Sequence, residues 1–96
     1  MSDPESIDPV RWIMSQQWEA QQSGILSLWS IYDHPDDFPD NYVARMFHSD
    51  KDGARATNKV MVGPSLNQIR NVMQSAGLTC LMRDRNDPPN VVETWL

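Results

Sequence analysis

Two strand-like runs separated by a short acidic loop constrain the fold of this chain more than any other feature. Residues 25–32 place large apolar side chains on both faces of an extended strand, which indicates a central strand or a sheet covered on both sides. Residues 42–48 form a second extended run. Pro35 and Pro39 interrupt the segment between them, because proline cannot join a central ladder. We therefore expect two strands separated by a constrained loop.

An N-terminal helix is indicated over about residues 9–23. Asp8 is a suitable N-cap, and Pro9 a suitable first helical residue. Apolar residues at helical spacing form a stripe of Val10, Ile13, Met14 and Trp18. This stripe is either part of the core or a surface that docks on a partner or a second copy, and Trp12 on the other side would be exposed if the stripe were buried. The candidate partner-binding residues of this helix are Trp12, Met14 and Trp18.

A second helix is indicated more clearly, over about residues 65–76. Ser65 precedes Gln68 by three residues, as in a capping box, and Gly77 stands where a glycine commonly ends a helix. One helical face carries only apolar residues, namely Leu66, Ile69, Val72, Met73 and Ala76. The pattern predicts an amphipathic helix that packs across a sheet.

The order of these elements predicts an α+β fold. Further short strands are expected over residues 59–62, 78–83 and 91–95. The expected architecture is a small antiparallel sheet of four to five strands, with the second helix across one face and the N-terminal helix in addition. The expected organisation is a disordered N-terminus over 1–7, a helical arm over 8–24 and a single α+β domain over 25–96.

Composition excludes several classes of protein. The formal net charge of −5 over 96 residues argues against binding to nucleic acid, whose phosphates require clustered lysine and arginine. The single cysteine, Cys80, cannot form a disulfide within the chain, which fits a reducing compartment. The sequence has neither a signal-peptide pattern nor an apolar run of ~20 residues. We expect a cytoplasmic protein without a nucleic-acid or membrane partner.

The acidic loop carries four aspartates around His34 but no metal-binding pattern. It lacks the alternate acidic positions, the glycine and the distal glutamate of an EF-hand. A zinc site would need ligands from His34, His48 and Cys80, which lack the paired spacing of such sites. We therefore interpret the aspartates as turn-forming residues and expect no metal and no cofactor. Cys80 is expected to be a buried strand residue rather than a nucleophile.

Arg45 is the strongest single polar candidate. It shares a predicted strand face with Val43 and Phe47, so its guanidinium is expected to be partly buried and to need a partner. An aspartate of the preceding loop would make Arg45 a structural clamp. The alternative is that Arg45 faces a shallow pocket and receives an anionic ligand. The clamp is the favoured interpretation.

The same region resembles a group of short bacterial proteins of unknown function. Residues 29–39 read Trp-x-Ile-Tyr-Asp-His-Pro-x-Asp-Phe-Pro, and residues 42–45 read Tyr-Val-Ala-Arg. The similarity covers roughly residues 28–96, including Gly-Leu-Thr at 77–79 and Val-Glu-Thr-Trp at 92–95. It leaves the N-terminal helix outside. The resemblance implies one compact bacterial domain and no particular chemistry.

Two functional hypotheses follow from these observations. The first is a small non-enzymatic interaction module, with self-association as one form of it. The second is a small enzyme or anionic-ligand-binding protein, whose site would be formed by Tyr32, His34, Asp36 and Arg45. The first is favoured because an enzyme normally needs convergent polar groups in a pocket. A deep pocket lined by Tyr32, His34 and Arg45 would favour the second, and a flat apolar patch would favour the first.

Overall fold

The computed structural model describes residues 8–81 and 88–96, which form a five-stranded sheet and two helices. The helices are α1 (Pro9–Gln22) and α2 (Leu66–Ser75). The strands are β1 (Leu26–Asp33), β2 (Tyr42–Asp50), β3 (Gly53–Gly63), β4 (Cys80–Leu81) and β5 (Val91–Trp95). The expected disorder of residues 1–7 lies outside the described residues. No helix in the described ranges is long and apolar enough to cross a membrane.

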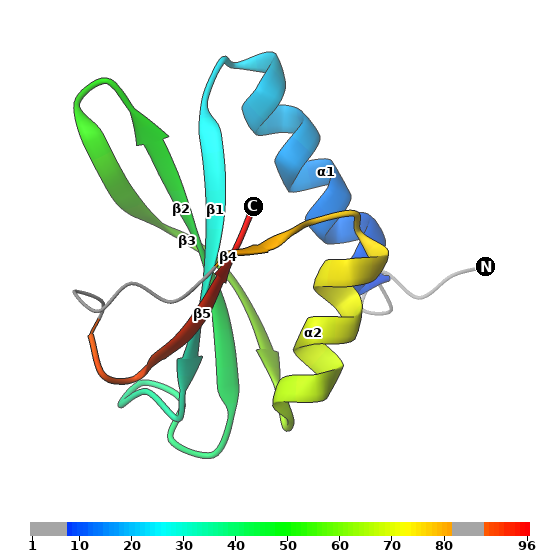
Figure 1. The fold of residues 1–96 in the computed structure, drawn as a ribbon, viewed down its shortest axis with the longest axis vertical. Helices are drawn as coiled ribbons and strands as arrows, with labels where there is room; N and C mark the ends of the chain where they lie inside the picture. Colours follow the sequence, from blue (N-terminus) through cyan, green and yellow to red (C-terminus); the bar gives the residue numbers. More distant parts are fainter. Residues whose placement is uncertain (1–7, 82–87) are drawn as a thin grey trace.

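The strands are ordered β3-β2-β1-β5-β4, and every neighbouring pair is antiparallel. The predicted α+β fold is therefore confirmed, as is the central position of β1. Both helices pack on the same face of the sheet (Figure 1). β3 is longer than the strand expected over 59–62, and it follows a tight turn at Lys51 and Asp52. β4 is shorter than the strand expected over 78–83, the end of which lies outside the described residues.

Both helix starts are capped as the sequence predicts. The Asp8 side chain accepts a hydrogen bond of 2.9 Å from the Val10 N–H, and Pro9 follows as the first helical residue. The Ser65 hydroxyl accepts one of 3.2 Å from the Gln68 N–H. Each bond satisfies a backbone donor that the first turn of a helix leaves unpaired. These caps fix where the chain leaves the sheet and enters each helix.

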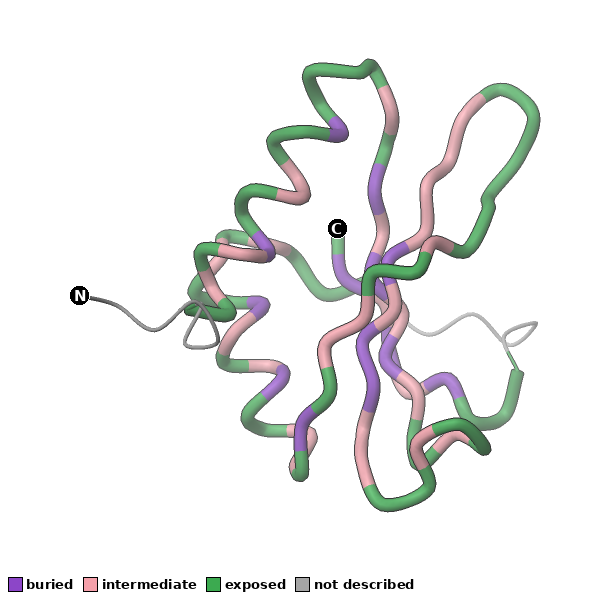
Figure 2. Tube along the Cα trace, turned by 180° about the vertical axis from the view of Figure 1, so that it is seen from behind, coloured by how far each residue is buried: buried purple, intermediate pink, exposed green. Residues whose placement is uncertain are grey.

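The core lies between the two helices and the sheet. Figure 2 shows the buried residues along the inner sides of the helices and in the central strands. The largest fully buried side chains are Ile13, Trp29, Ile31, Val43, Met46, Ile69 and Met73. All but Val43 belong to one continuous cluster that joins α1, α2, β1 and β2. α1 is thus packed on the core of its own chain.

Met73→Ala is expected to lower the free energy of unfolding by about 2–5 kcal/mol, the usual cost of a buried large-to-small change. Met73 has no exposed surface and faces the core from α2. The next residue, Gln74, is exposed, so Gln74→Ala should change the free energy of unfolding by less than about 0.5 kcal/mol. Urea unfolding of both variants beside the wild type gives the comparison. Equal losses would mean that α2 presents a different face to the sheet.

Only part of the predicted apolar stripe of α1 is buried, and the expected exposure of Trp12 is wrong. The helix turns Trp12 inward, where its ring meets Trp29 edge-on with 5.6 Å between ring centroids. Ile13 is buried as expected. Met14 and Trp18, by contrast, are 51% and 63% exposed. Trp12 is therefore part of the packing within this chain, and only Met14 and Trp18 of the proposed partner face are available to another molecule.

The cause of this orientation is a polar residue on the buried side of α1. The Gln17 side-chain oxygen accepts a hydrogen bond of 2.8 Å from the Trp29 indole N–H, and a second bond from the Ser27 hydroxyl. A buried indole N–H usually needs such an acceptor. Because Gln17 fills that role, the face of α1 that packs on the sheet includes a polar residue. This face therefore differs from the most apolar stripe of the helix sequence.

Candidate functional site

One face of the sheet has no helix on it in the described part of the chain (Figure 1). Successive residues of a strand point to opposite faces, so the neighbours of the core residues Trp29 and Met46 point away from the helices. Strand pairing aligns Leu28 with Phe47, and Arg45 with Val60. We call this surface the open sheet face; its main side chains are Leu26, Leu28, Tyr32, Arg45, Phe47, Val60 and Val62, and Val43 of the same face is buried among them.

The open sheet face exposes large apolar groups. Leu26 is 50% exposed and Val62 is 41% exposed. Tyr32 and Phe47 lie between them on neighbouring strands and are half-buried. Leu81 is exposed on the same face beyond β5, and the polar residues Thr94 and Ser30 separate it from the apolar groups of β1 and β2. Exposed apolar groups that form a patch on a small domain often mark a binding site.

Arg45 is paired with an aspartate of the acidic loop, the partner that the clamp interpretation expects. Its Nη2 donates a hydrogen bond of 3.0 Å to Oδ2 of Asp37, and its Nη1 donates one of 3.3 Å to the Thr57 carbonyl oxygen. The Arg45 side chain is 28% exposed and the Asp37 side chain 53% exposed. The guanidinium therefore links the β1–β2 loop to β3 while keeping part of its surface in solvent.

A shallow depression of about 340 Å³ lies beside this clamp on the open sheet face. Its lining residues are Tyr32, Pro35, Asp37, Val43, Arg45, Phe47, Ala56 and Asn90. The structure thus brings together Tyr32 and Arg45 of the four predicted site residues. The aspartate that lines the depression is Asp37, one position after the predicted Asp36.

His34 and Asp36 lie elsewhere. The His34 Nδ1 contacts the Asp33 carboxylate, and the ring packs edge-on against Tyr42 with 5.0 Å between centroids. His34 has φ +49°, a backbone conformation that is uncommon for residues other than glycine; its N–H donates a bond of 3.0 Å to the Asn41 carbonyl oxygen, which closes the loop. Asp36 is exposed. The predicted group of four is therefore divided, and His34 is not positioned to act together with Arg45.

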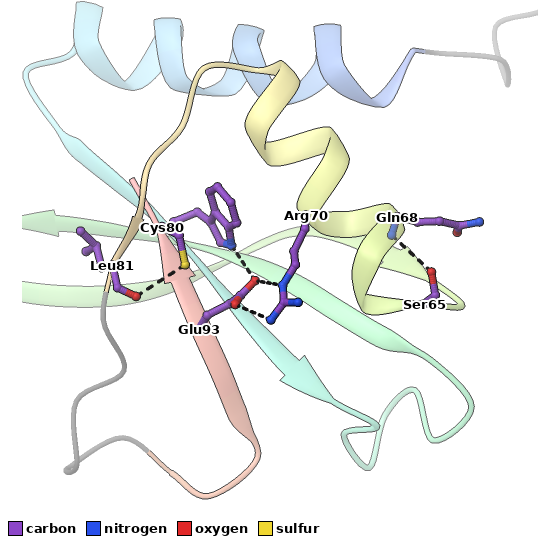
Figure 3. A network of polar contacts seen from close by, with 7 residues as sticks. Ser65, Gln68, Arg70, Cys80, Leu81 and Glu93 are labelled. Carbon is purple, nitrogen blue, oxygen red and sulfur yellow. Dashed lines mark hydrogen bonds and ion pairs between the residues drawn. The ribbon is translucent and has the colours of Figure 1, made fainter.

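A buried ion pair that the sequence did not indicate joins α2 to β5. The Arg70 Nε donates a hydrogen bond of 2.9 Å to Oε1 of Glu93, and its Nη2 donates one of 3.0 Å to Oε2. The Trp95 indole N–H donates a third bond of 3.0 Å to the same carboxylate. Figure 3 shows this network under α2. In the sequence, Glu93 alternates with the apolar residues Val91 and Trp95. Alternate strand residues share a face, so this spacing is the one sequence signal that an acid lies on the buried face and needs a partner.

The network sets the protonation behaviour of its members. Burial alone would raise the pKa of Glu93, but the hydrogen bonds from Arg70 and Trp95 outweigh it, so the pKa lies below its usual value. The pKa of Cys80 is raised by loss of solvent around the thiol and by the nearby Glu93 carboxylate. Cys80 itself is exposed at the edge strand β4, so its predicted burial is wrong. A raised pKa leaves little thiolate at neutral pH, which does not suit a nucleophile.

Two further findings bear on function. Within residues 8–81 and 88–96, no group of three histidine, cysteine or acidic residues is placed to hold a metal ion. The chain matches no protein-family model, no curated protein and no solved structure. The resemblance to short bacterial proteins of unknown function stays a prediction.

Proposed function

We propose that this protein is a small non-enzymatic binding module that contacts a protein partner through the open sheet face. The observation that carries the proposal is the placement of α1 and α2 on the same side of the sheet, which leaves large apolar groups on the other side uncovered by a helix in the described residues. Tyrosine and arginine are enriched among the residues that contribute most to protein–protein binding. Arg45 lies near the middle of this surface, and Tyr32 lies near the end where β1 enters the acidic loop.

The arrangement of the polar groups supports a binding role over catalysis. Arg45 is already paired with Asp37. Glu93 is enclosed under α2 and fully engaged with Arg70 and Trp95. An active site generally needs an acid, a base or a nucleophile that converge on a substrate in a pocket. The depression on the open sheet face is lined by Arg45, the half-buried Tyr32 and Asp37, and the Asp37 carboxylate is already bound to Arg45.

A photo-crosslinking experiment tests the proposal. The photoreactive amino acid benzoylphenylalanine is placed at position 47 on the open sheet face, and in a second variant at position 74 on the exposed side of α2. In cells that naturally produce the protein, position 47 is expected to give defined protein adducts, and Leu28→Asp in the same chain to abolish them. An adduct of twice the mass of the chain would identify a second copy as the partner. Similar adducts from positions 47 and 74 would contradict the proposal.

Binding of an anionic ligand at Arg45 is the second candidate function. The observation in its favour is that the partly exposed guanidinium lines the depression next to Tyr32. In this case Asp37 would hold the guanidinium in place until the ligand displaces it. The two candidates differ in how far the stability of the fold depends on Arg45.

Arg45→Ala is expected to lower the free energy of unfolding by about 1–2 kcal/mol. The change removes the two hydrogen bonds of the guanidinium and the packing of its stem between strands. Because Asp37 is half exposed, water can hydrate its carboxylate once Arg45 is removed. The loss of stability is therefore small for an ion pair. Urea unfolding without any ligand gives the value, and Arg55→Ala at an exposed pair with Asp50 is the control. A variant as stable as the wild type would favour the anionic-ligand site.

A further inference from the structure

A second concave site lies on the helix side of the sheet, between α1 and the β2–β3 hairpin. Its volume is about 270 Å³. Its lining residues are Gln16, Glu19, Ala20, Ser23, Ile25, His48, Thr57, Asn58 and Lys59. We call it the hairpin cleft. Figure 1 shows the β2–β3 hairpin diverging from α1 toward its tip.

An irregularity in β3 shapes one wall of the hairpin cleft. Arg45 pairs with Val60, but Phe47 pairs with Ala56, so β3 uses four residue steps where β2 uses two. The Thr57 hydroxyl donates a hydrogen bond of 2.9 Å to the Met46 carbonyl oxygen and accepts one of 3.1 Å from the Lys59 N–H. Such bulges redirect side chains. This one brings Asn58 and Lys59 to the wall that faces α1.

The hairpin cleft contains opposite charges that do not neutralise each other. Glu19 comes from α1 and Lys59 from β3, and both line the cleft. No ion pair among the described residues involves either of them. The side chains of Gln16, His48 and Asn58 make no hydrogen bond within the described ranges, so the walls also present unpaired amide and imidazole groups. The carboxylate, the ammonium and these polar groups are available to one ligand.

We propose that the hairpin cleft binds a small zwitterion of amino-acid size. The ligand ammonium would contact the Glu19 carboxylate, and the ligand carboxylate would contact the Lys59 ammonium. A ligand with a single charge would leave one charged wall unpaired, so a zwitterion has the complementary charge pattern. The volume lies just below the range of about 300–1,000 Å³ for larger ligands, which favours a molecule of amino-acid size. Ala20 and Ile25 supply apolar contact for its carbon chain.

This proposal is independent of the open sheet face. The hairpin cleft and the depression beside Arg45 share no lining residue and lie on opposite sides of the sheet. Loss of one activity should therefore leave the other intact.

A series of amino acids with increasing charge separation tests the proposal. Glycine, β-alanine, 4-aminobutanoate and 6-aminohexanoate are titrated into the full chain, and binding is followed by amide chemical shifts. At least one member is expected to bind saturably, with the largest shifts at residues 16–20 and 57–59, whereas butylamine and butanoate should not. Native-state binding should also raise the melting temperature. Absence of saturable binding by every member would overturn the proposal.

Charge variants identify the two contacts. Glu19→Gln and Lys59→Met are each expected to weaken binding at least tenfold, and Gln74→Ala on α2 to leave it unchanged. The exchange variant carries both Glu19→Lys and Lys59→Glu. Its affinity should return to within a few-fold of the wild-type affinity, because the zwitterion can bind in the reverse direction. Both positions are exposed, so the variants are expected to fold. Unchanged binding in the single variants, or no recovery in a folded exchange variant, would overturn the assignment of Glu19 and Lys59.

Discussion

Arg70→Met is expected to lower the free energy of unfolding by about 1–3 kcal/mol, because it removes the main partner of a largely buried carboxylate while Arg70 itself is partly in solvent. The Glu93 side chain is only 11% exposed, so its carboxylate would remain largely buried with the Trp95 indole N–H as its main remaining donor. Arg70 is 41% exposed and could reach solvent if Glu93 were removed instead. Glu93→Gln should therefore cost less than Arg70→Met.

Urea unfolding of the two single variants and of the double variant measures this asymmetry. In the double variant no buried charge is left unpaired, so it should be more stable than Arg70→Met alone. A double variant whose loss of stability relative to the wild type equals the sum of the two single losses would show that the two residues act independently.

The same pair makes stability depend on pH. The pKa of Glu93 in the folded protein lies below its usual value of 4.5. A carboxyl with a lowered folded pKa stabilises the fold fully above its unfolded pKa, and this contribution is lost as the pH falls through the folded pKa. The difference in stability between wild type and Glu93→Gln should therefore be constant near neutral pH and should shrink below about 4.5. Urea unfolding of both proteins over that range checks the sign.

The features that the sequence predicts correctly depend on neighbours along the chain. The caps Asp8 and Ser65 each bind a backbone N–H within three residues. The Arg45–Asp37 clamp joins residues only eight positions apart. Such contacts follow from local geometry, because the intervening chain leaves few other partners within reach.

The features that the sequence misses depend on distant partners. Gln17 turns inward because of Trp29, and Arg70 pairs with Glu93 across 23 positions of sequence. Periodicity counts apolar residues on a helix face, so it cannot identify a glutamine that is buried because a strand supplies its donor. His48, which the sequence offers only as part of a rejected zinc set, lines the hairpin cleft, whose other walls come from α1 and β3.

Trp29→Ala is expected to lower the free energy of unfolding by about 3–5 kcal/mol, as for other buried aromatic residues replaced by alanine. Trp29 has no exposed surface, contacts the ring of Trp12 and donates to Gln17. Its removal leaves a cavity between α1 and the sheet and takes away one of the two donors of the Gln17 oxygen. Since a helix of 14 residues is marginal without tertiary packing, we also expect α1 to detach more readily than α2.

Trp29→Phe separates the two contributions to this loss. Phenylalanine keeps most of the ring volume but lacks the N–H, so the expected cost is about 1–2 kcal/mol, the value of one buried hydrogen bond and a small cavity. Urea unfolding gives both free energies, and amide hydrogen exchange reports the opening of each helix. In Trp29→Ala, exchange should accelerate more for residues 13–20 than for residues 69–75. Equal acceleration in both helices would show that α1 is not held mainly by Trp29. In that case the contacts of Trp29 with Trp12 and Gln17 would not determine which face of α1 stays exposed.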